Sequence, residues 1–118
     1  MSNTKVTSTN FANKKVLSNE CSEVYTANII GGQWSLPICY SLLNGKLRFG
    51  ELKKLLPNIT ERMLTLQLRK LEKNKVLTRK IYAEVPPRVE YELTAIGYEL
   101  KPIIIELEKW GEKHKELK

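Results

Sequence analysis

The sequence predicts an α+β, mostly helical domain in which a helix-turn-helix precedes a β-hairpin. Residues 60–73 carry leucine at every third or fourth position, the spacing of a helix with one buried side. Two runs rich in β-branched and aromatic residues follow, 76–83 and 89–93, and they flank a turn with two adjacent prolines. This order of elements predicts a winged helix-turn-helix domain.

The first two helices are predicted from apolar spacing and from the glycines that follow them. A short helix over 24–30 ends at Gly31-Gly32, where glycine tolerates a left-handed conformation. A second helix over 34–43 ends at Asn44-Gly45, with Ser35 as its expected cap. Pro37 lies early in this helix, where a missing N–H costs least.

The helix-turn-helix itself is expected between residues 46 and 73. The segment 46–48 is short and extended, and a helix over 49–56 follows it. The Pro57-Asn58 pair breaks the chain before Thr60, which is placed to cap the second helix, and Ile59 is placed to act as a hydrophobic staple. Two helices separated by so short a turn form a helix-turn-helix.

A last helix is expected from Thr94, its cap, to about Lys115, with Pro102 kinking or splitting it near Leu100. Its apolar stripe is hard to bury within so small a domain, so a second copy of the chain is the expected cover. The alternative is that the stripe packs back onto helix 34–43. The stripe consists of Ile103, Ile104, Leu107 and Trp110, and Ile105 widens it.

Charge is concentrated in one part of the 118-residue chain. The net charge is +7, and residues 46–75 contain nine basic and three acidic residues, whereas residues 94–118 are balanced. A localised basic surplus indicates a polyanionic partner more strongly than an even one would.

The expected DNA contacts follow from the helical geometry of residues 60–73. The side opposite the leucines carries Arg62, Leu66, Arg69 and Lys73, with Thr65 and Lys70 at its flanks. The first half of such a helix enters the major groove, where Arg62 would read guanine and Leu66 or Thr65 would touch a thymine methyl group. Arg69, Lys70 and Lys73 lie further along the helix, where basic side chains are suited to contacts with phosphates. The expected DNA-binding residues on and before this helix are Arg48, Thr60, Arg62, Thr65, Leu66, Gln67, Arg69 and Lys70.

The turn at Pro86-Pro87-Arg88 is stiff, since each proline fixes its φ angle. A stiff tip with one arginine suits the minor groove or a backbone phosphate, which adds Arg88 to the expected DNA-binding residues. The alternative is an ordinary proline-braced hairpin with Arg88 facing solvent.

Other functional classes find little support. The sequence has no nucleophile with a base at suitable spacing, phosphate-binding glycine loop or metal-ligand cluster, and its single histidine, His114, lies in the charged C-terminal segment. We therefore expect no catalytic residues, no metal and no cofactor. No apolar run is long enough to span a membrane and the N-terminus lacks a signal peptide, so a cytoplasmic location with reduced Cys21 and Cys39 is expected.

Five segments resemble the HxlR-type regulators, which are bacterial winged-helix transcription factors related to the MarR group. They are Cys21, Ile30–Trp34, Arg48–Leu52, Ile59–Leu64 and Glu84–Thr94. The resemblance spans about residues 21–111, and 85–94 with Gly97 is its most specific part. Together with the composition, it predicts a polar, flexible tail over residues 1–19 and a winged helix domain over residues 20–118 that includes a C-terminal dimerisation helix.

The resemblance implies a homodimer on a palindromic double-stranded DNA operator. The subunits would associate through the N-terminal helix, with Val24 and Ile29, and through the C-terminal stripe. Some members sense oxidants or electrophiles through an N-terminal cysteine, and Cys21 stands in that place. The alternative is a simply packed cysteine, since Glu20 and Glu23 discourage a thiolate.

Two alternatives stay open at the level of function. Some winged helices bind only protein, and such a module without DNA binding is the main alternative here. A small-molecule effector is compatible with DNA binding, and a pocket between dimer helices could be lined by aromatic residues, although these are more often part of a core. The aromatic residues concerned are Tyr25, Trp34, Tyr40 and Trp110.

Overall fold

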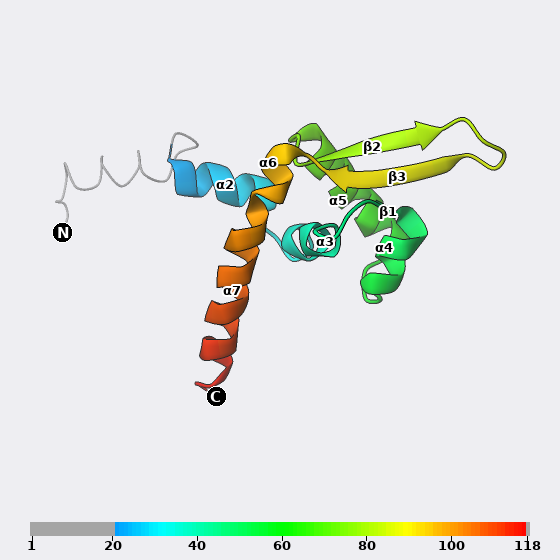
Figure 1. Cartoon of the computed structure of the whole chain (residues 1–118). Coiled ribbons are helices and arrows are strands. Elements are labelled where there is room, and N and C mark those ends of the chain that lie inside the picture. The colour runs from blue at the N-terminus through cyan, green and yellow to red at the C-terminus, as the bar shows by residue number, and fades with distance from the viewer. Residues whose placement is uncertain (1–20, 118) are drawn as a thin grey trace. The chain divides into compact units, whose positions relative to one another are not determined.

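The computed structural model describes residues 21–117, and the tail expected over 1–19 lies outside them. Helices and strands follow the predicted order (Figure 1). They are α2 (Ser22–Ile30), α3 (Ser35–Ser41), β1 (Leu47–Arg48), α4 (Phe49–Leu55), α5 (Glu61–Lys73), β2 (Leu77–Tyr82), β3 (Arg88–Leu93), α6 (Ala95–Tyr98) and α7 (Leu100–Lys115).

The chain divides into two units between Gly32 and Gln33, and α2 is the described helix of the first unit. It begins two residues before the predicted start, and none of its residues is buried. The helix ends at Gly31, and Gly32 then adopts a φ of 92°, a conformation that glycine reaches without strain. The predicted glycine stop is therefore confirmed.

In the second unit, three antiparallel strands form a sheet in the order β1-β3-β2. The β2–β3 hairpin pairs Leu77 with Leu93 at its base and Tyr82 with Arg88 at its far end. The hairpin projects beyond the helices (Figure 1). Arg88 is thus the first residue of β3 and not part of the turn, so the prediction that it sits at the tip is wrong.

The core of the second unit lies between α3, α4, α5 and the base of the hairpin. All three leucines predicted to face inward from α5 are buried, and so is Ile59 before its cap. The largest completely buried side chains are Ile38, Leu42, Leu52, Leu64, Leu68, Leu71 and Leu77. Because these contacts hold one side of α5, its opposite side faces solvent.

The start of α3 differs from the prediction. Trp34 occupies the cap position, and Ser35 is the first residue of the helix and completely buried, so the prediction of a Ser35 cap is wrong. The cause is tertiary packing, because the Ser35 hydroxyl donates a hydrogen bond to Gln67 on α5 at 3.4 Å. Pro37 is the third residue of α3, early in the helix as predicted.

The C-terminal helix is split where the proline predicts. Thr94 caps α6 by accepting from the Gly97 amide at 3.1 Å, and Glu99 separates α6 from α7. Pro102 is the third residue of α7. The stripe of α7 divides as well, because Ile104 is buried while Ile103, Leu107 and Trp110 are 47%, 45% and 64% exposed. Packing against the chain's own helices is therefore confirmed for Ile104, whereas the other stripe residues, Ile105 included, are at least 37% exposed.

Candidate nucleic-acid interface

Helix α5 has an outward face on which an exposed leucine is ringed by cations. Leu66 is 48% exposed, and Arg62, Arg69 and Lys70 lie one helical turn from it at i−4, i+3 and i+4. Met63, 37% exposed, completes the ring at i−3. The predicted outward face is confirmed in this respect, with Thr65 and Lys70 half-buried at its flanks.

The cations of this face are not neutralised by acidic neighbours. Among the described residues, none of the four basic side chains Arg62, Arg69, Lys70 and Lys73 forms an ion pair. By contrast, Glu72 on the same helix pairs with Arg79 of β2 at 3.7 Å. The outward face therefore keeps its positive charge available to an anionic partner.

The beginning of α5 is held by two threonines. The Thr60 hydroxyl accepts a hydrogen bond from the Met63 amide at 3.0 Å, which confirms Thr60 as the cap. The Thr65 hydroxyl donates to the Glu61 carbonyl at 2.9 Å. That bond commits the hydroxyl proton of Thr65 to its own helix.

Gln67 is turned toward the protein. Its side-chain oxygen accepts from Ser35 at 3.4 Å, and its nitrogen donates to the Met63 sulfur at 3.7 Å. Both ends of this amide are occupied within the chain, so Gln67 links α5 to α3. Gln67 was expected at the base edges of DNA, but its side chain packs against its own domain.

Arg88 belongs to a cluster on one face of the hairpin. Its guanidinium lies over the Tyr82 ring at 4.0 Å from the ring centre. It also pairs with Glu84 at 3.1 Å and with Glu90 at 3.8 Å, and the side chain is 29% exposed. The turn itself, residues 83–87, carries no cation, so the arginine reaches outward only from beside the turn.

Glu90 is the enclosed member of this cluster, with a side chain that is 13% exposed. Burial pushes the pKa of its carboxyl upward, but a hydrogen bond from Tyr82 and the charges of Lys46 and Arg88 outweigh burial, so the pKa is lowered. Lys46 pairs with Glu90 at 3.5 Å, and that charge raises the pKa of the lysine. The cluster was missed in the sequence, although the i,i+2 spacing of Arg88 and Glu90 on a strand puts both on one face.

Arg48 stands where β1 meets α4. Its amide donates to the Glu51 carboxylate at 2.8 Å, which fixes the start of α4. Its exposed side chain lines a groove of about 440 Å³ that runs between the start of α4 and residues 84–89, which comprise most of the hairpin turn and the start of β3. Arg48 is thus brought close to the hairpin, on the same side as Arg88.

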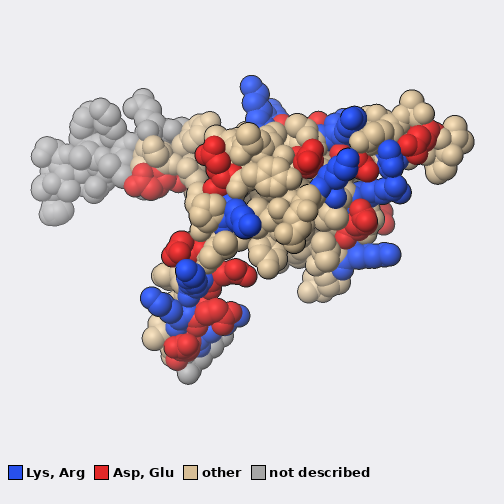
Figure 2. All heavy atoms as spheres, viewed as in Figure 1, with Lys and Arg blue, Asp and Glu red and all other residues tan. Residues whose placement is uncertain are grey.

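Basic side chains stand out over the region of α4 and the hairpin, whereas basic and acidic side chains alternate along α7 (Figure 2). On α7 the ion pairs are local, Lys109 with Glu106 and Lys115 with Glu112. The charge surplus is therefore a property of residues 46–75, which contain the helix-turn-helix, and not of the last helix. The hairpin, residues 76–93, has three basic and three acidic residues.

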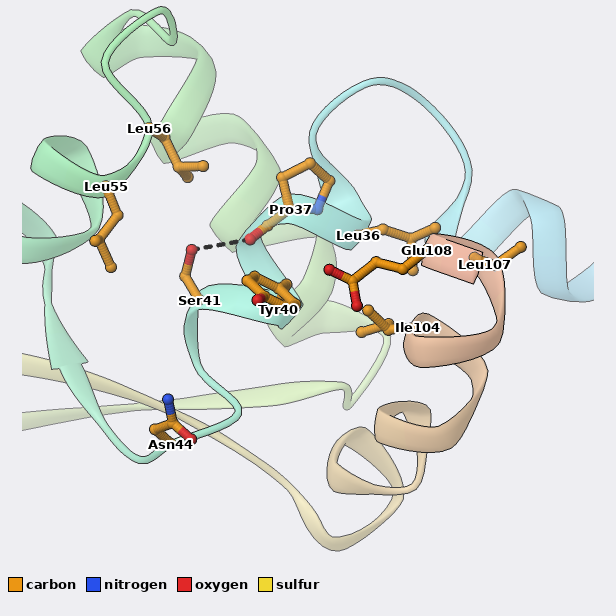
Figure 3. A pocket seen from close by; sticks show the side chains of 10 residues that line it. All are labelled: Leu36, Pro37, Tyr40, Ser41, Asn44, Leu55, Leu56, Ile104, Leu107 and Glu108. Carbon is orange, nitrogen blue, oxygen red and sulfur yellow. Dashed lines mark hydrogen bonds between the residues drawn. The ribbon is translucent and has the colours of Figure 1, made fainter. Parts of the chain in front are cut away.

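A largely apolar groove of about 590 Å³ lies between α3, the end of α4 and α7 (Figure 3). Tyr40 and Glu108 face into it from α3 and α7, and Ser41 donates to the Pro37 carbonyl at its edge at 2.9 Å. Tyr40 alone of the four aromatic residues expected at an effector pocket lines this groove. Trp110 lines a second groove along α7 and stacks on His114 with ring centres 5.1 Å apart.

The two cysteines have different surroundings. Cys39 is completely buried, and burial raises the pKa of its thiol to about 11, which supports its assignment to the core. Cys21 is partly exposed at the start of α2, where its thiol donates to the Glu23 carboxylate at 3.3 Å. That hydrogen bond lowers the pKa of Glu23.

Within residues 21–117, no cluster of histidine, cysteine and carboxylate side chains could hold a metal ion. Over the same range, every helix is too short or too polar to cross a membrane.

An uncompensated cationic helix in a helix-turn-helix, next to a projecting β-hairpin, defines the winged-helix class of DNA-binding regulators. The HxlR-like helix-turn-helix family matches residues 29–118, and the chain belongs to this family. The family and the relatives below are transcriptional regulators and not enzymes, as predicted from the sequence.

Individual relatives agree with this assignment. The HTH-type transcriptional regulator YdeP of Bacillus subtilis is 51% identical over 96 residues, which cover 81% of this chain and 75% of YdeP. The crystal structure of the HTH-type regulator YtcD is similar with a TM-score of 0.74 at 48% identity, covering 78% of this chain and 94% of that one. The redox regulator HypR in its oxidised form has a TM-score of 0.74 at 45% identity, covering 79% and 96%.

Proposed function

We propose that this regulator binds a palindromic operator in double-stranded DNA as a homodimer. The observation that carries the proposal is the outward face of α5, where exposed cations without acidic partners surround an exposed leucine. In a helix-turn-helix the second helix enters the major groove with its first half. The unit that acts in this way is residues 20–118, and it would act on the chromosome in the cytoplasm.

The side chains of α5 divide by position along the helix. Arg62 faces base edges, where a guanidinium reads guanine O6 and N7. Thr60 and Thr65 lie in the same half, and Arg69 and Lys70 lie a turn further and contact phosphates. Gln67 supports the helix from behind through Ser35 instead of reading a base, given its two internal hydrogen bonds.

The hairpin serves as the wing, with Arg88 and Arg48 as its contacts to phosphate or the adjacent minor groove. Arg88 reaches DNA by exchanging its exposed partner Glu84, 51% exposed, for a phosphate, while Tyr82 and Glu90 keep the guanidinium in place. Held in this way, the Arg88 guanidinium is preorganised for DNA binding.

A second copy of the chain covers the exposed part of the α7 stripe, and Val24 and Ile29 of α2 contribute to the same association. Half-exposed Ile103, Leu107 and Trp110 form an apolar surface that a monomer would leave in water. A two-fold axis in the protein would be matched by inverted half-sites in the operator.

Cys21 is the proposed sensor of an oxidant or electrophile, supported by its partial exposure and by the similarity to the redox regulator HypR. The family match begins at residue 29, so it does not include Cys21. A small-molecule effector is the second candidate, and the largely apolar groove between α3 and α7 has a volume in the range of small-molecule sites.

Hydroxyl-radical footprinting of the full chain on the DNA upstream of its own gene tests the proposal, with and without a thiol oxidant. We expect protection of two half-sites about one helical turn apart, or a multiple of that distance. A Cys21→Ser variant should keep the footprint in oxidant if Cys21 is the sensor. Absence of any protected site, on this DNA and on a random duplex pool, would contradict the proposal.

A winged helix that binds only protein is the alternative function. The two differ in their salt dependence, because each phosphate contact contributes about −0.9 to the slope of log K against log salt. A steep negative slope on duplex DNA supports regulation through DNA, and a flat slope supports the protein-binding alternative.

A further inference from the structure

We infer that Leu66 and Met63 read the methyl groups of thymine in the major groove, so that each operator half-site contains a thymine that is recognised by its methyl group. This inference rests on the proposed function and specifies its target. It assigns the centre of the recognition surface to apolar contact, between Arg62, which reads a base, and Arg69 and Lys70, which hold the phosphates.

The arrangement of side chains on α5 supports this assignment. Leu66 lies at the middle of the outward face, and its neighbours at i−4, i+3 and i+4 are all basic. A protein partner with an apolar patch would meet three unpaired cations around the same leucine. Duplex DNA has the matching chemistry, since its phosphates surround a groove in which thymine alone presents a methyl group.

The polar groups that could compete for the same bases are already engaged. Gln67, the side chain on α5 suited to a bidentate contact with adenine, bonds to Ser35 and Met63. The Thr65 hydroxyl donates to Glu61 at 2.9 Å, which leaves its methyl group as the part free of its own helix. Apolar atoms and the cations therefore make up the free outward surface of the first half of α5.

Met63 lies beside Leu66 on the outward face, on the side opposite Thr65, and enlarges the apolar centre of that face. It is 37% exposed, and its sulfur accepts the hydrogen bond from Gln67 at 3.7 Å. The amide thereby holds the thioether in position beside Leu66. Two apolar side chains at i and i+3 form a surface wide enough for methyl groups on neighbouring bases.

The test compares thymine with uracil, which differ only by the methyl group. The full chain is used to select a binding duplex from a random pool, and each thymine of that duplex is then replaced singly by deoxyuridine. Burial of one methyl group contributes about 0.8 kcal/mol, which corresponds to about a fourfold change in Kd. We expect at least one thymine in each half-site whose replacement weakens wild-type binding by about this factor.

The protein side of the test uses two exposed leucines. Leu66→Ala should lose the difference between thymine and uracil at that position, whereas Leu55→Ala, a 56% exposed leucine at the end of α4, should keep it. Circular dichroism checks that both variants fold. Binding that is indifferent to every thymine methyl group, or a methyl effect that persists in both Leu66→Ala and Met63→Ala, would overturn the inference and leave DNA binding intact. Failure to select any duplex would overturn the proposed function itself.

Discussion

Arg88 is held by three neighbours, and one of them, Glu84, would compete with DNA at the proposed wing contact. Tyr82 and Glu90 lie under and behind the guanidinium, while Glu84 is at the exposed side, 3.1 Å away. Exposed ion pairs contribute up to about 1 kcal/mol, so DNA can displace Glu84 at small cost. In the proposed wing contact, the Glu84 carboxylate therefore occupies the position that a phosphate would take.

Removing this carboxylate should strengthen DNA binding. Glu84→Gln is expected to lower Kd by about two- to fivefold, since Arg88 no longer exchanges a carboxylate for a phosphate. Fluorescence anisotropy with a selected duplex measures the change. Glu106→Gln is the matched control, because it removes the same charge from an exposed pair on α7. Equal gains in the two variants would show an effect of net charge alone.

The cysteines should differ in reactivity by their burial. At neutral pH a thiol with a pKa of about 11 has almost no thiolate, so Cys39 should resist iodoacetamide in the folded protein. We expect mass spectrometry to find one alkylated cysteine, Cys21, in the native state and two after unfolding. Rapid labelling of Cys39 in the native protein would contradict its place in the core.

At the scale of elements, the sequence was sufficient to predict where a helix begins or breaks, because a single residue determines such a boundary locally. Pro102 predicted the break before α7, and Thr60 predicted the start of α5, because both act through their own backbone neighbourhood. Ser35 and Arg88 were misplaced because their positions depend on side chains that they contact in the fold, Gln67 for Ser35 and both Tyr82 and Glu90 for Arg88. The outward face of α5 was predictable, whereas the engagement of Gln67 was not.

The junction of the hairpin with α6 leaves no room for a side chain at Gly97. A Cβ there would lie 2.2 Å from the Val76 carbonyl oxygen and 3.2 Å from the Leu93 side chain. Gly97→Ala should therefore lower the free energy of unfolding by about 1–3 kcal/mol in urea denaturation. Gly111→Ala, in open space within α7, should raise it by about 1 kcal/mol because alanine favours a helix. Equal effects of the two changes would refute this packing.

At the scale of the whole molecule, α7 explains why a dimer is expected. Ile104 is buried against its own chain, and the exposed remainder of the stripe is the surface that we propose a second copy covers. Leu107→Glu should convert the dimer to a monomer in sedimentation equilibrium, since a buried charge at an apolar interface is costly. The control is Lys115→Glu on the same helix, 72% exposed and not part of the groove that Ile103, Leu107 and Trp110 line, which should remain dimeric. A wild-type monomer would contradict the proposal directly.

The operator affinity of Arg62→Gln, measured together with its salt dependence, is the most direct test of DNA recognition by α5. Loss of a bidentate contact to guanine costs about 1–3 kcal/mol, so Kd should rise roughly five- to 150-fold for the selected duplex. Lys109→Gln, which removes the same charge from α7, should leave Kd nearly unchanged. An unchanged Kd for Arg62→Gln in an intact dimer would contradict the account.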